Sequence, residues 1–188
     1  MAILQIRFIS SNPYKIKEAT DILGAIGVTV VPMSLKIEEL QTTDTQRLVR
    51  DKAVKAFEQI GRPLFVEHTG LYLAYINDLP GGLTQIVWDA LQADRFTQLF
   101  GNTPDTTVTA RTTIGYVDGK RIHTFVGQTR GRIVDCPRGN RDFQWDCVFV
   151  PDGETQTFSE MGDRKNEISM RRKALDEMAA FLQRRGVR

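Results

Sequence analysis

A short segment near the N-terminus has the residue types of a phosphate-binding turn. Ser10–Lys15, with the sequence SSNPYK, follows an apolar run and precedes a predicted helix. Free backbone amides at a helix N-terminus attract anions, and phosphate is the natural candidate. Lys15 in the first turn opposes the helix dipole, which favours an anion lying between its ammonium group and the amides. On this segment alone, a capped helix with a solvated lysine is the simpler interpretation.

Several acidic residues lie at the ends of predicted elements. Two or three of Glu38, Glu39, Asp44 and Glu67 could converge on a hard cation such as Mg²⁺. Magnesium uses carboxylates together with the phosphate oxygens of a substrate. Taken one at a time, each of these residues is better explained as a solvated surface acid.

Aromatic and charged residues are concentrated in two later segments. Asp142–Asp146, with the sequence DFQWD, places aromatic rings between carboxylates. Such a cluster can stack a nucleobase and accept its ring hydrogens, although an aromatic strand that fills the core is the simpler explanation of this segment alone. Lys165–Lys173 opens the last predicted helix with several cations, and a polar helix face is the alternative interpretation there.

The elements that position these residues alternate between helix and strand in the first half of the chain. Periodicity and caps predict helices at 13–26, 44–61, 83–100 (one helix or two) and 165–185. Strands are predicted at 3–10, 28–33, 63–66, 71–76, 107–117, 120–126, 127–134 and 143–150. The polar segment 67–70 is expected to interrupt a strand and to mark a site, and Asp118-Gly119 predicts a hairpin.

This order of elements predicts an α/β fold with a mixed β-sheet and flanking helices. The length of 188 residues predicts a single domain spanning 1–188. An insertion at about 71–111 is expected to form a second lobe. A cleft between the two lobes would then hold the site.

Composition argues against several other classes of protein. The chain is 41% hydrophobic and 26% charged, which excludes disorder as its main state. No apolar run reaches the ~18 residues of a membrane helix, and the N-terminus lacks the regions of a signal peptide, so we expect a cytoplasmic protein with no membrane partner. A net charge of +2 predicts no binding to duplex nucleic acid. Cys136 and Cys147 form neither a disulfide framework nor a zinc motif.

Taken in order, the segments resemble the inosine triphosphate pyrophosphatase family. The resemblance covers nearly the whole chain, and it starts at Ser10–Lys15, where the family usually has Thr-Gly-Asn followed by a lysine. No single segment is specific, but their combination is. The other segments that carry it are Ile37–Gln41, Phe65–Leu71, Leu79–Gly81, Arg138–Asp146, Phe149–Gly153, Thr157–Met161 and Lys165–Ser169.

The resemblance implies an elongated two-lobed fold with a nucleotide cleft, usually in a homodimer. Family members hydrolyse ITP, dITP or XTP with Mg²⁺ to the monophosphate and pyrophosphate. The resemblance implies catalytic roles for Glu39, Glu67, His68 and Lys52, with Glu39 and Glu67 at the metal; Glu38 and Lys55 are alternatives to Glu39 and Lys52. The nucleotide-binding residues that it implies are Ser11, Asn12, Lys15, Thr69, Phe143, Trp145, Asp146, Lys165, Ser169 and Arg171.

Three positions depart from the family pattern. His68 stands where the family has an aspartate that acts on the metal or the attacking water, and imidazole is a poor ligand for Mg²⁺. Catalysis is therefore expected to suffer more than phosphate binding. Met170 replaces a histidine that contacts the base, and Gln144 replaces a glycine and narrows the pocket. Alternatively, Glu67 takes over the metal, or His68 acts as a base or binds Mn²⁺, and activity is retained.

Two functions follow from the resemblance, and a purely structural interaction protein with an empty pocket is a third interpretation. The favoured hypothesis is a module that binds inosine-type purine triphosphates such as dITP and ITP, with hydrolysis weakened or lost, and that acts as a nucleotide sensor through an effector protein. Sensors that resemble this family occur in bacterial anti-phage defence. The alternative is an active Mg²⁺-dependent pyrophosphatase for the same nucleotides.

Overall fold

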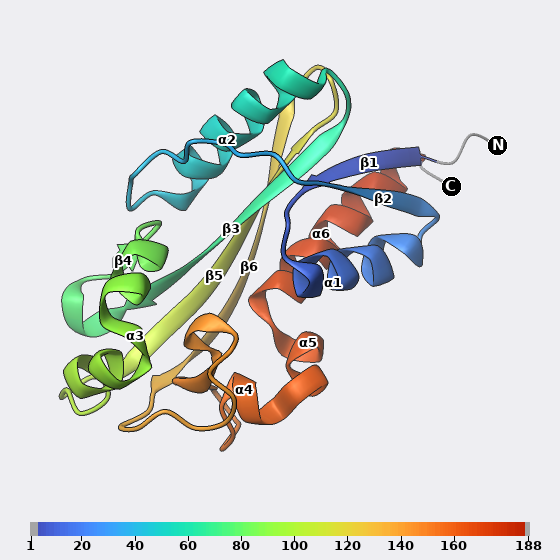
Figure 1. Cartoon of the computed structure of the whole chain (residues 1–188). Helices are drawn as coiled ribbons and strands as arrows, with labels where there is room; N and C mark the ends of the chain where they lie inside the picture. Colours follow the sequence, from blue (N-terminus) through green and yellow to red (C-terminus); the bar gives the residue numbers. More distant parts are fainter. Residues whose placement is uncertain (1–3, 187–188) are drawn as a thin grey trace.

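The centre of the molecule is a mixed sheet of seven strands with helices on both faces (Figure 1). A computed structural model describes residues 4–186. The strand order is β2-β1-β3-β5-β6-β7, and β4 pairs with β3 beside this path. The strands are β1 (Leu4–Ile9), β2 (Val28–Met33), β3 (Leu64–Leu73), β4 (Leu79–Gly81), β5 (Thr107–Val117), β6 (Ile122–Ile133) and β7 (Phe149–Pro151). The predicted α/β fold with a mixed sheet is confirmed.

Two of the predicted breaks between strands are wrong. The segment 67–70 does not interrupt a strand, because β3 keeps its register with β5 from Leu64 to Leu73. Backbone hydrogen bonds form a ladder whatever the polarity of the side chains, so polar residues do not break it. The predicted strands 120–126 and 127–134 are likewise one strand, β6. The predicted start of β1 at Ile3 lies outside the described residues.

The predicted strand 143–150 is only partly a strand. Its first half is a 3₁₀ turn, η2 (Gln144–Cys147), and only Phe149–Pro151 pairs with β6. Gln144 has a φ of 43°, a left-handed conformation that cannot continue a strand. The aromatic segment therefore turns back over the sheet, which leaves Phe143 half-buried while Trp145 is buried.

Two helices begin at caps that the sequence predicts. Asn12 caps α1 (Pro13–Gly24), and Asp44 caps α2 (Thr45–Ile60), which stops at Gly61 with a φ of 62°. The helix α3 (Thr84–Phe100) has a sharp kink at Gln92, whose φ of 53° is not helical. The predicted helix 165–185 is interrupted, because Ser169 is extended and separates α5 (Lys165–Ile168) from α6 (Met170–Arg184). The short helix α4 (Phe158–Met161) precedes them.

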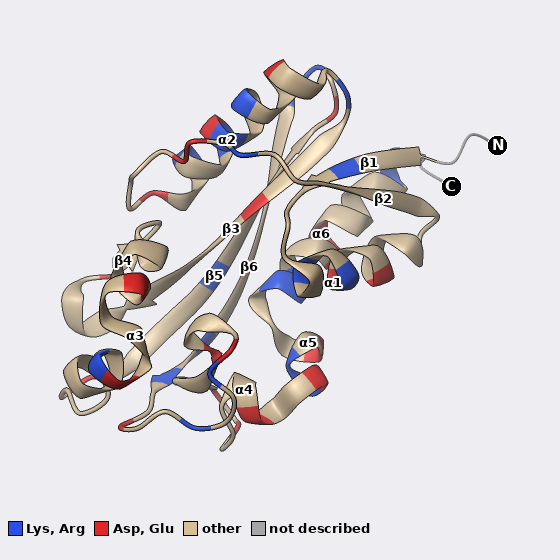
Figure 2. Cartoon of the chain, in the orientation of Figure 1, with Lys and Arg blue, Asp and Glu red and all other residues tan. Residues whose placement is uncertain are grey.

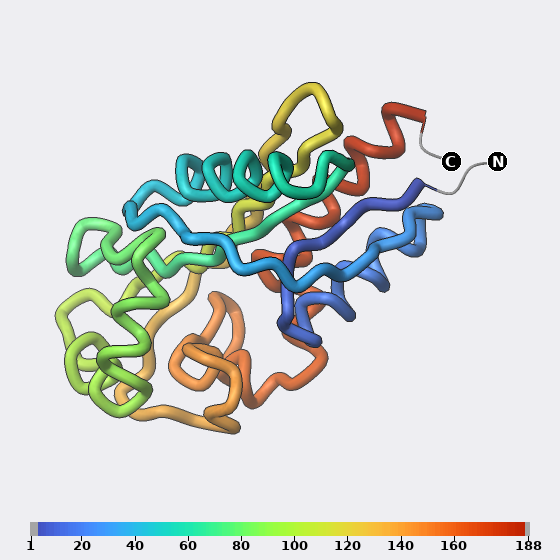
Figure 3. The backbone as a smooth tube through the Cα atoms, turned by 45° about the horizontal axis from the view of Figure 1, so that its top comes forward, coloured from blue at the N-terminus to red at the C-terminus, as the bar shows by residue number. Residues whose placement is uncertain are grey.

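The core consists of three apolar clusters around the long strands. α1 and α6 pack on one face of the sheet with Ile114, and α2 packs on the other with Val117 (Figures 1 and 3). A third cluster joins α3 to the segment that contains Trp145. Figure 2 shows acidic and basic positions interleaved along the helices. The predicted boundary of a second lobe at 71–111 stays a prediction. None of the described helices is long and apolar enough to cross a membrane.

Candidate functional site

The candidate site lies at a gap along one edge of β3. β1 pairs with this edge up to Phe65, and β4 begins to pair with it at Leu71. Among residues 4–186 no strand covers the edge between these positions, although β5 covers the opposite edge throughout. Glu67, His68 and Thr69 occupy the uncovered stretch. The polar segment 67–70 therefore marks the stretch of β3 that lacks a neighbouring strand on one edge. β3 itself is continuous there.

Glu67 is a buried carboxylate held by two cations. Its Oε1 lies 2.8 Å from Lys15 Nζ, and Arg171 Nε donates to both of its oxygens, at 3.0 and 3.2 Å. Burial alone would raise the pKa of Glu67, but Arg171 and Lys15 outweigh it and hold the pKa at about 2. Glu67 is therefore ionised throughout the physiological pH range.

His68 and Glu39 form the neighbouring part of the site. Glu39 is paired with Lys52 of α2, and its Oε2 lies 3.8 Å from His68 Nδ1. Burial would raise the pKa of Glu39, but Lys52 lowers it. Burial lowers the pKa of His68 and Glu39 only partly offsets this, so the imidazole is neutral at pH 7. Its buried Nε2 has no hydrogen-bond partner in the described part of the chain.

The carboxylates of this site do not fit a resident Mg²⁺ ion as they stand. Glu67 is engaged by Lys15 and Arg171, and Glu39 by Lys52 and His68. No group of three or more His, Cys, Asp or Glu side chains within residues 4–186 is arranged to hold a metal ion. Magnesium prefers oxygen ligands free of competing cations. The predicted metal-binding role of Glu39 and Glu67 stays a prediction.

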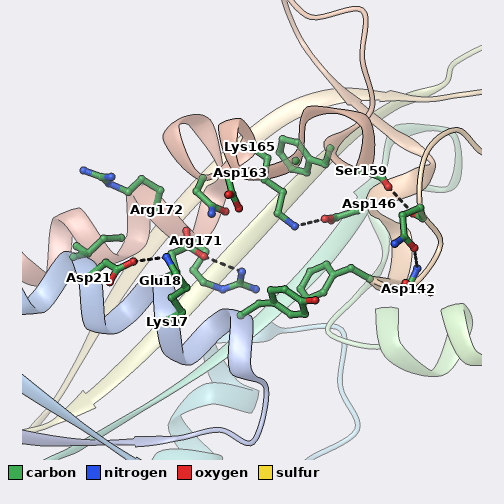
Figure 4. A pocket seen from close by; sticks show the side chains of 17 residues that line it. Lys17, Glu18, Asp21, Asp142, Asp146, Ser159, Asp163, Lys165, Arg171 and Arg172 are labelled. Carbon is green, nitrogen blue, oxygen red and sulfur yellow. Dashed lines mark hydrogen bonds and ion pairs between the residues drawn. The ribbon is translucent and has the colours of Figure 1, made fainter.

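A second part of the site is a cavity of ≈ 300 Å³ beside α1, which we call the α1 cavity (Figure 4). In Figure 4, Lys165 points toward Asp146, and Glu18 reaches Arg171 from α1. Tyr14 and Phe143 contribute aromatic rings at 5.6 Å, nearly perpendicular to one another. The cavity thus combines aromatic surface with charged hydrogen-bonding groups.

Lys165 links the two key residues of the 142–146 segment. It is paired with Asp146, and its Nζ lies 4.2 Å from the centre of the Phe143 ring. Burial raises the pKa of Asp146 although Lys165 opposes the shift. A carboxylate with a raised pKa accepts a hydrogen bond when ionised and donates one when protonated. The predicted residues Phe143, Asp146, Lys165 and Arg171 therefore line one cavity.

Two further hollows lie next to the α1 cavity. The central hollow, of ≈ 210 Å³, contains His68 and Thr69, and the loop hollow, of ≈ 320 Å³, contains Ser11 and Asn12. Phe143 and Arg171 line both the α1 cavity and the central hollow. The residues shared by the central and loop hollows are Lys15, Glu39, Lys52, Glu67 and Gln144. The three spaces therefore adjoin one another, and we call the series that they form the path. The α1 cavity and the central hollow contain aromatic rings as well as charged groups, whereas charged, polar and aliphatic residues line the loop hollow.

At the N-terminus of α1, the side chain of Lys15 is part of the site, whereas two of the backbone amides are occupied by the helix cap. Asn12 Oδ1 accepts hydrogen bonds from the amides of Tyr14 and Lys15, at 3.0 and 3.2 Å. These two donors are therefore already satisfied by the cap. Lys15 lines the central and loop hollows and contacts Glu67, so it is not the solvated lysine of the simpler interpretation.

Two predicted nucleotide-binding residues have mainly structural contacts. Trp145 lines the central hollow but packs against Phe149 and Phe158 in the core. Ser169 accepts a hydrogen bond from the amide of Arg172 as the cap of α6, and it lies 3.3 Å from Glu18. Their predicted contacts with nucleotide stay predictions.

The alternatives Glu38 and Lys55 contact one another outside the path. Lys55 Nζ donates to the backbone oxygen of Glu38 at 3.0 Å, on the exposed side of α2. Glu39 and Lys52 line the central and loop hollows instead.

Gln144 and Met170, which depart from the family pattern, both line the central hollow. Gln144 donates through its side chain to Gln85 of α3 at 2.5 Å and so bridges two sides of the path. Met170 is buried among apolar residues, and its backbone oxygen lies against Gly127 of β6, where a Cβ would be only 2.0 Å away.

Sequence reasoning missed Glu18 and Gln85. Glu18 is buried and accepts a hydrogen bond from Arg171 Nη1 at 3.1 Å, although the two residues are 153 positions apart. A signal was present, since Glu18 lies three residues after Lys15 and therefore on the same helix face. Gln85 carries no such signal, because its contact depends on how α3 packs.

The fold and the path define an α/β protein with a cleft that combines aromatic rings with charged groups. The chain belongs to the Ham1 family, whose model matches residues 6–181. It is 33% identical to a dITP/XTP pyrophosphatase of Methanopyrus kandleri, over 95% of this chain and 96% of the relative. It is 35% identical to an inosine triphosphate pyrophosphatase of Kluyveromyces lactis, over 97% and 98%.

Solved structures support the same architecture. The structure of a Ham1 protein from Coxiella burnetii matches with a TM-score of 0.84, over 96% of this chain and 99% of that chain. The Ham1 protein of Staphylococcus aureus matches with a TM-score of 0.79, over 95% and 98%. Both are 23% identical to this chain, so these two likenesses show the fold alone.

Proposed function

We propose that this protein binds inosine-type purine nucleoside triphosphates, such as ITP and dITP, and hydrolyses them weakly or not at all. The names of its relatives support the nucleotide class, since the two described above are pyrophosphatases for dITP, XTP or inosine triphosphate. The observation that carries the loss of hydrolysis is His68. A neutral, buried imidazole lies beside Glu39 on the open edge of β3, where the family resemblance expects an aspartate.

The α1 cavity suits the purine base. Phe143 offers a ring for stacking, which contributes ~1–3 kcal/mol per base in comparable sites. Lys165 and Arg171 can donate to the 6-oxo group that distinguishes an inosine-type base from adenine. Asp146 can accept a hydrogen from the ring nitrogens. This combination supports recognition of a 6-oxo purine.

The central and loop hollows suit the triphosphate. Lys15 and Lys52 line both hollows, and lysine is a common point charge for phosphate. The base and the phosphates of one nucleotide would then follow the path from the α1 cavity to the loop hollow.

The replacement of a carboxylate by His68 affects the reaction more than binding. Hydrolysis requires groups that stabilise charge as it develops on the phosphates and that orient the attacking water. A neutral imidazole supplies neither a negative charge for a cation nor a strong base. Ground-state contacts from Lys15, Lys52 and Phe143 are not altered by this replacement.

The test measures binding and turnover in the same sample. The protein is mixed with dITP and Mg²⁺, and in parallel with Mn²⁺, while pyrophosphate release and bound nucleotide are followed. We expect stoichiometric binding without rapid turnover. His68→Asp is expected to raise turnover at least about tenfold in Mg²⁺ while affinity changes less than about threefold. His68→Asn, which removes the imidazole without adding a carboxylate, is the matched control and should not raise turnover.

An active pyrophosphatase is the second candidate. The segments shared with the family and the names of the relatives favour it. It predicts release of monophosphate and pyrophosphate by the wild-type protein at ~1 to 10³ per second with Mg²⁺ or Mn²⁺. Turnover in this range would make His68 a tolerated variant and would exclude the binding-only function.

We further propose a cytoplasmic homodimer that passes the nucleotide signal to an effector protein, as expected of an anti-phage sensor. Three large apolar side chains in one stretch, Tyr75, Leu79 and Ile86, are each about half exposed, which supports a protein contact there. Light scattering of the purified chain tests the dimer. Recovery of the same partner protein only when dITP is present tests the sensor.

A further inference from the structure

The charges along the path carry an inference about how the phosphates are held. The central hollow contains the cations Lys15, Lys52 and Arg171 against the carboxylates Glu39 and Glu67. These residues carry one positive charge in excess, which the Glu18 partner of Arg171 offsets. The loop hollow adds Lys36 and no further carboxylate, so the excess along the two hollows is one positive charge. A site built around a resident cation would need the opposite balance.

The contacts of the carboxylates point the same way. Lys15 and Arg171 together engage both oxygens of Glu67, and Arg171 is itself buried and held by Glu18. A cation approaching Glu67 would meet two positive groups, one of which cannot turn away. The Glu39 oxygens face Lys52 and His68. Neither carboxylate offers a free oxygen pair for a metal ion.

His68 changes what the open stretch of β3 can bind. An ionised carboxylate only accepts hydrogen bonds and repels phosphate, whereas an imidazole N–H can donate one. His68 lines the central hollow, where its Nδ1 lies 3.8 Å from Glu39 Oε2. A phosphate oxygen that enters the hollow can therefore accept a hydrogen bond from this imidazole.

We propose that this protein binds the triphosphate of its nucleotide directly through Lys15, Lys52 and the His68 region, without a divalent cation. The inference rests on the proposed function, since it concerns how the same nucleotide is held. In this arrangement the lysines neutralise the phosphate charge that a metal ion would otherwise neutralise. Exchange of a carboxylate for His68 turns a place for a cation into a place for an anion.

The experiment is a calorimetric titration of the full chain with ITP, once in excess EDTA and once in excess Mg²⁺. We expect the two affinities to agree within about threefold. Binding in Mg²⁺ that weakens at least tenfold in EDTA would overturn the metal-free site and leave the proposed function standing. Absence of binding under both conditions would overturn the proposed function and this inference together.

Variants of His68 make the test specific. His68→Asp adds a negative charge, so we expect at least tenfold weaker ITP binding in EDTA and recovery of that affinity in Mg²⁺. His68→Asn adds no charge, and we expect its binding to stay independent of Mg²⁺ within threefold. Circular dichroism and thermal unfolding show that each variant is folded before it is titrated. Equal metal dependence of the two variants would contradict the role given to the charge at this position.

Discussion

Arg171 and Glu67 face one another in the buried wall of the central hollow, with Nε 3.0 Å from Oε2 and 3.2 Å from Oε1. The same guanidinium also contacts Glu18 through Nη1. It thereby ties α1, β3 and α6 together at the point where the α1 cavity and the central hollow meet. We therefore expect Arg171 to be important for stability.

Removal of Arg171 should be strongly destabilising. Arg171→Ala leaves Glu18 without its guanidinium partner and Glu67 with Lys15 alone, and a broken buried pair of this kind costs ~3–5 kcal/mol. Arg172→Ala is the matched control, because its pair with Asp176 is exposed and contributes at most ~1 kcal/mol. Urea unfolding at pH 7 measures both. Similar losses of stability for the two variants would show that the buried ion pair contributes no more than the exposed one.

Glu67 should make the protein sensitive to acid. Its pKa is about 2 in the folded protein and 4.5 when unperturbed, so its contribution to stability is fully present above about pH 4.5 and is lost as the pH falls toward 2. The shift corresponds to ~3 kcal/mol. Unfolding of wild type and Glu67→Gln between pH 7 and pH 3 checks this. The wild-type advantage should shrink below pH 4.5, and an advantage independent of pH would contradict the assignment.

Phe143 should contribute to binding of the base and not of the phosphates. Phe143→Ala removes a ring of the α1 cavity, and loss of one stacking contact corresponds to an affinity for ITP lower by ~5- to 150-fold. Pyrophosphate has no base, so its binding should change less than twofold. Calorimetry with both ligands measures this difference. A parallel loss for pyrophosphate would place Phe143 at the phosphates instead.

Lys15 should contribute to binding of the phosphates. Lys15→Gln removes a charge from the central and loop hollows, and one charge-assisted contact corresponds to ITP binding weaker by ~10- to 150-fold. Lys120→Gln is the matched control, an exposed lysine in the turn between β5 and β6, far from the three hollows in sequence. We expect Lys120→Gln to stay within twofold of wild type. An equal effect of both variants would indicate long-range attraction only.

Gly70 should tolerate no side chain. A Cβ there would lie 2.4 Å from the backbone oxygen of Gly81, because β4 crosses closely at the end of the open stretch. Gly70→Ala is expected to cost ~1–3 kcal/mol in the free energy of unfolding. Gly24→Ala is the control, since a Cβ at Gly24 meets nothing within 4 Å, and it should change stability by less than ~1 kcal/mol. A thermal shift of equal size in both would contradict the close approach.

Local features of the fold could be predicted from the sequence alone. The caps Asn12 and Asp44, the stop at Gly61 and the strand Val28–Met33 follow from residues within a few positions of one another. The continuity of β3 could not be predicted in this way, because its ladder depends on pairing with β5 more than thirty residues later. The break at Ser169 also escaped, since its side chain is held by Glu18 of α1.

For the candidate site, too, some features could be predicted from the sequence and others only from the tertiary structure. The sequence by itself determined which residue types are present, including the family resemblance and the substitution of His68. Only the tertiary structure decided that Glu67 is shared by Lys15 and Arg171, that His68 is buried and neutral, and that Trp145 belongs largely to the core. The physical reason is that charge state and burial depend on contacts between distant segments, and no local pattern in the chain encodes those distances.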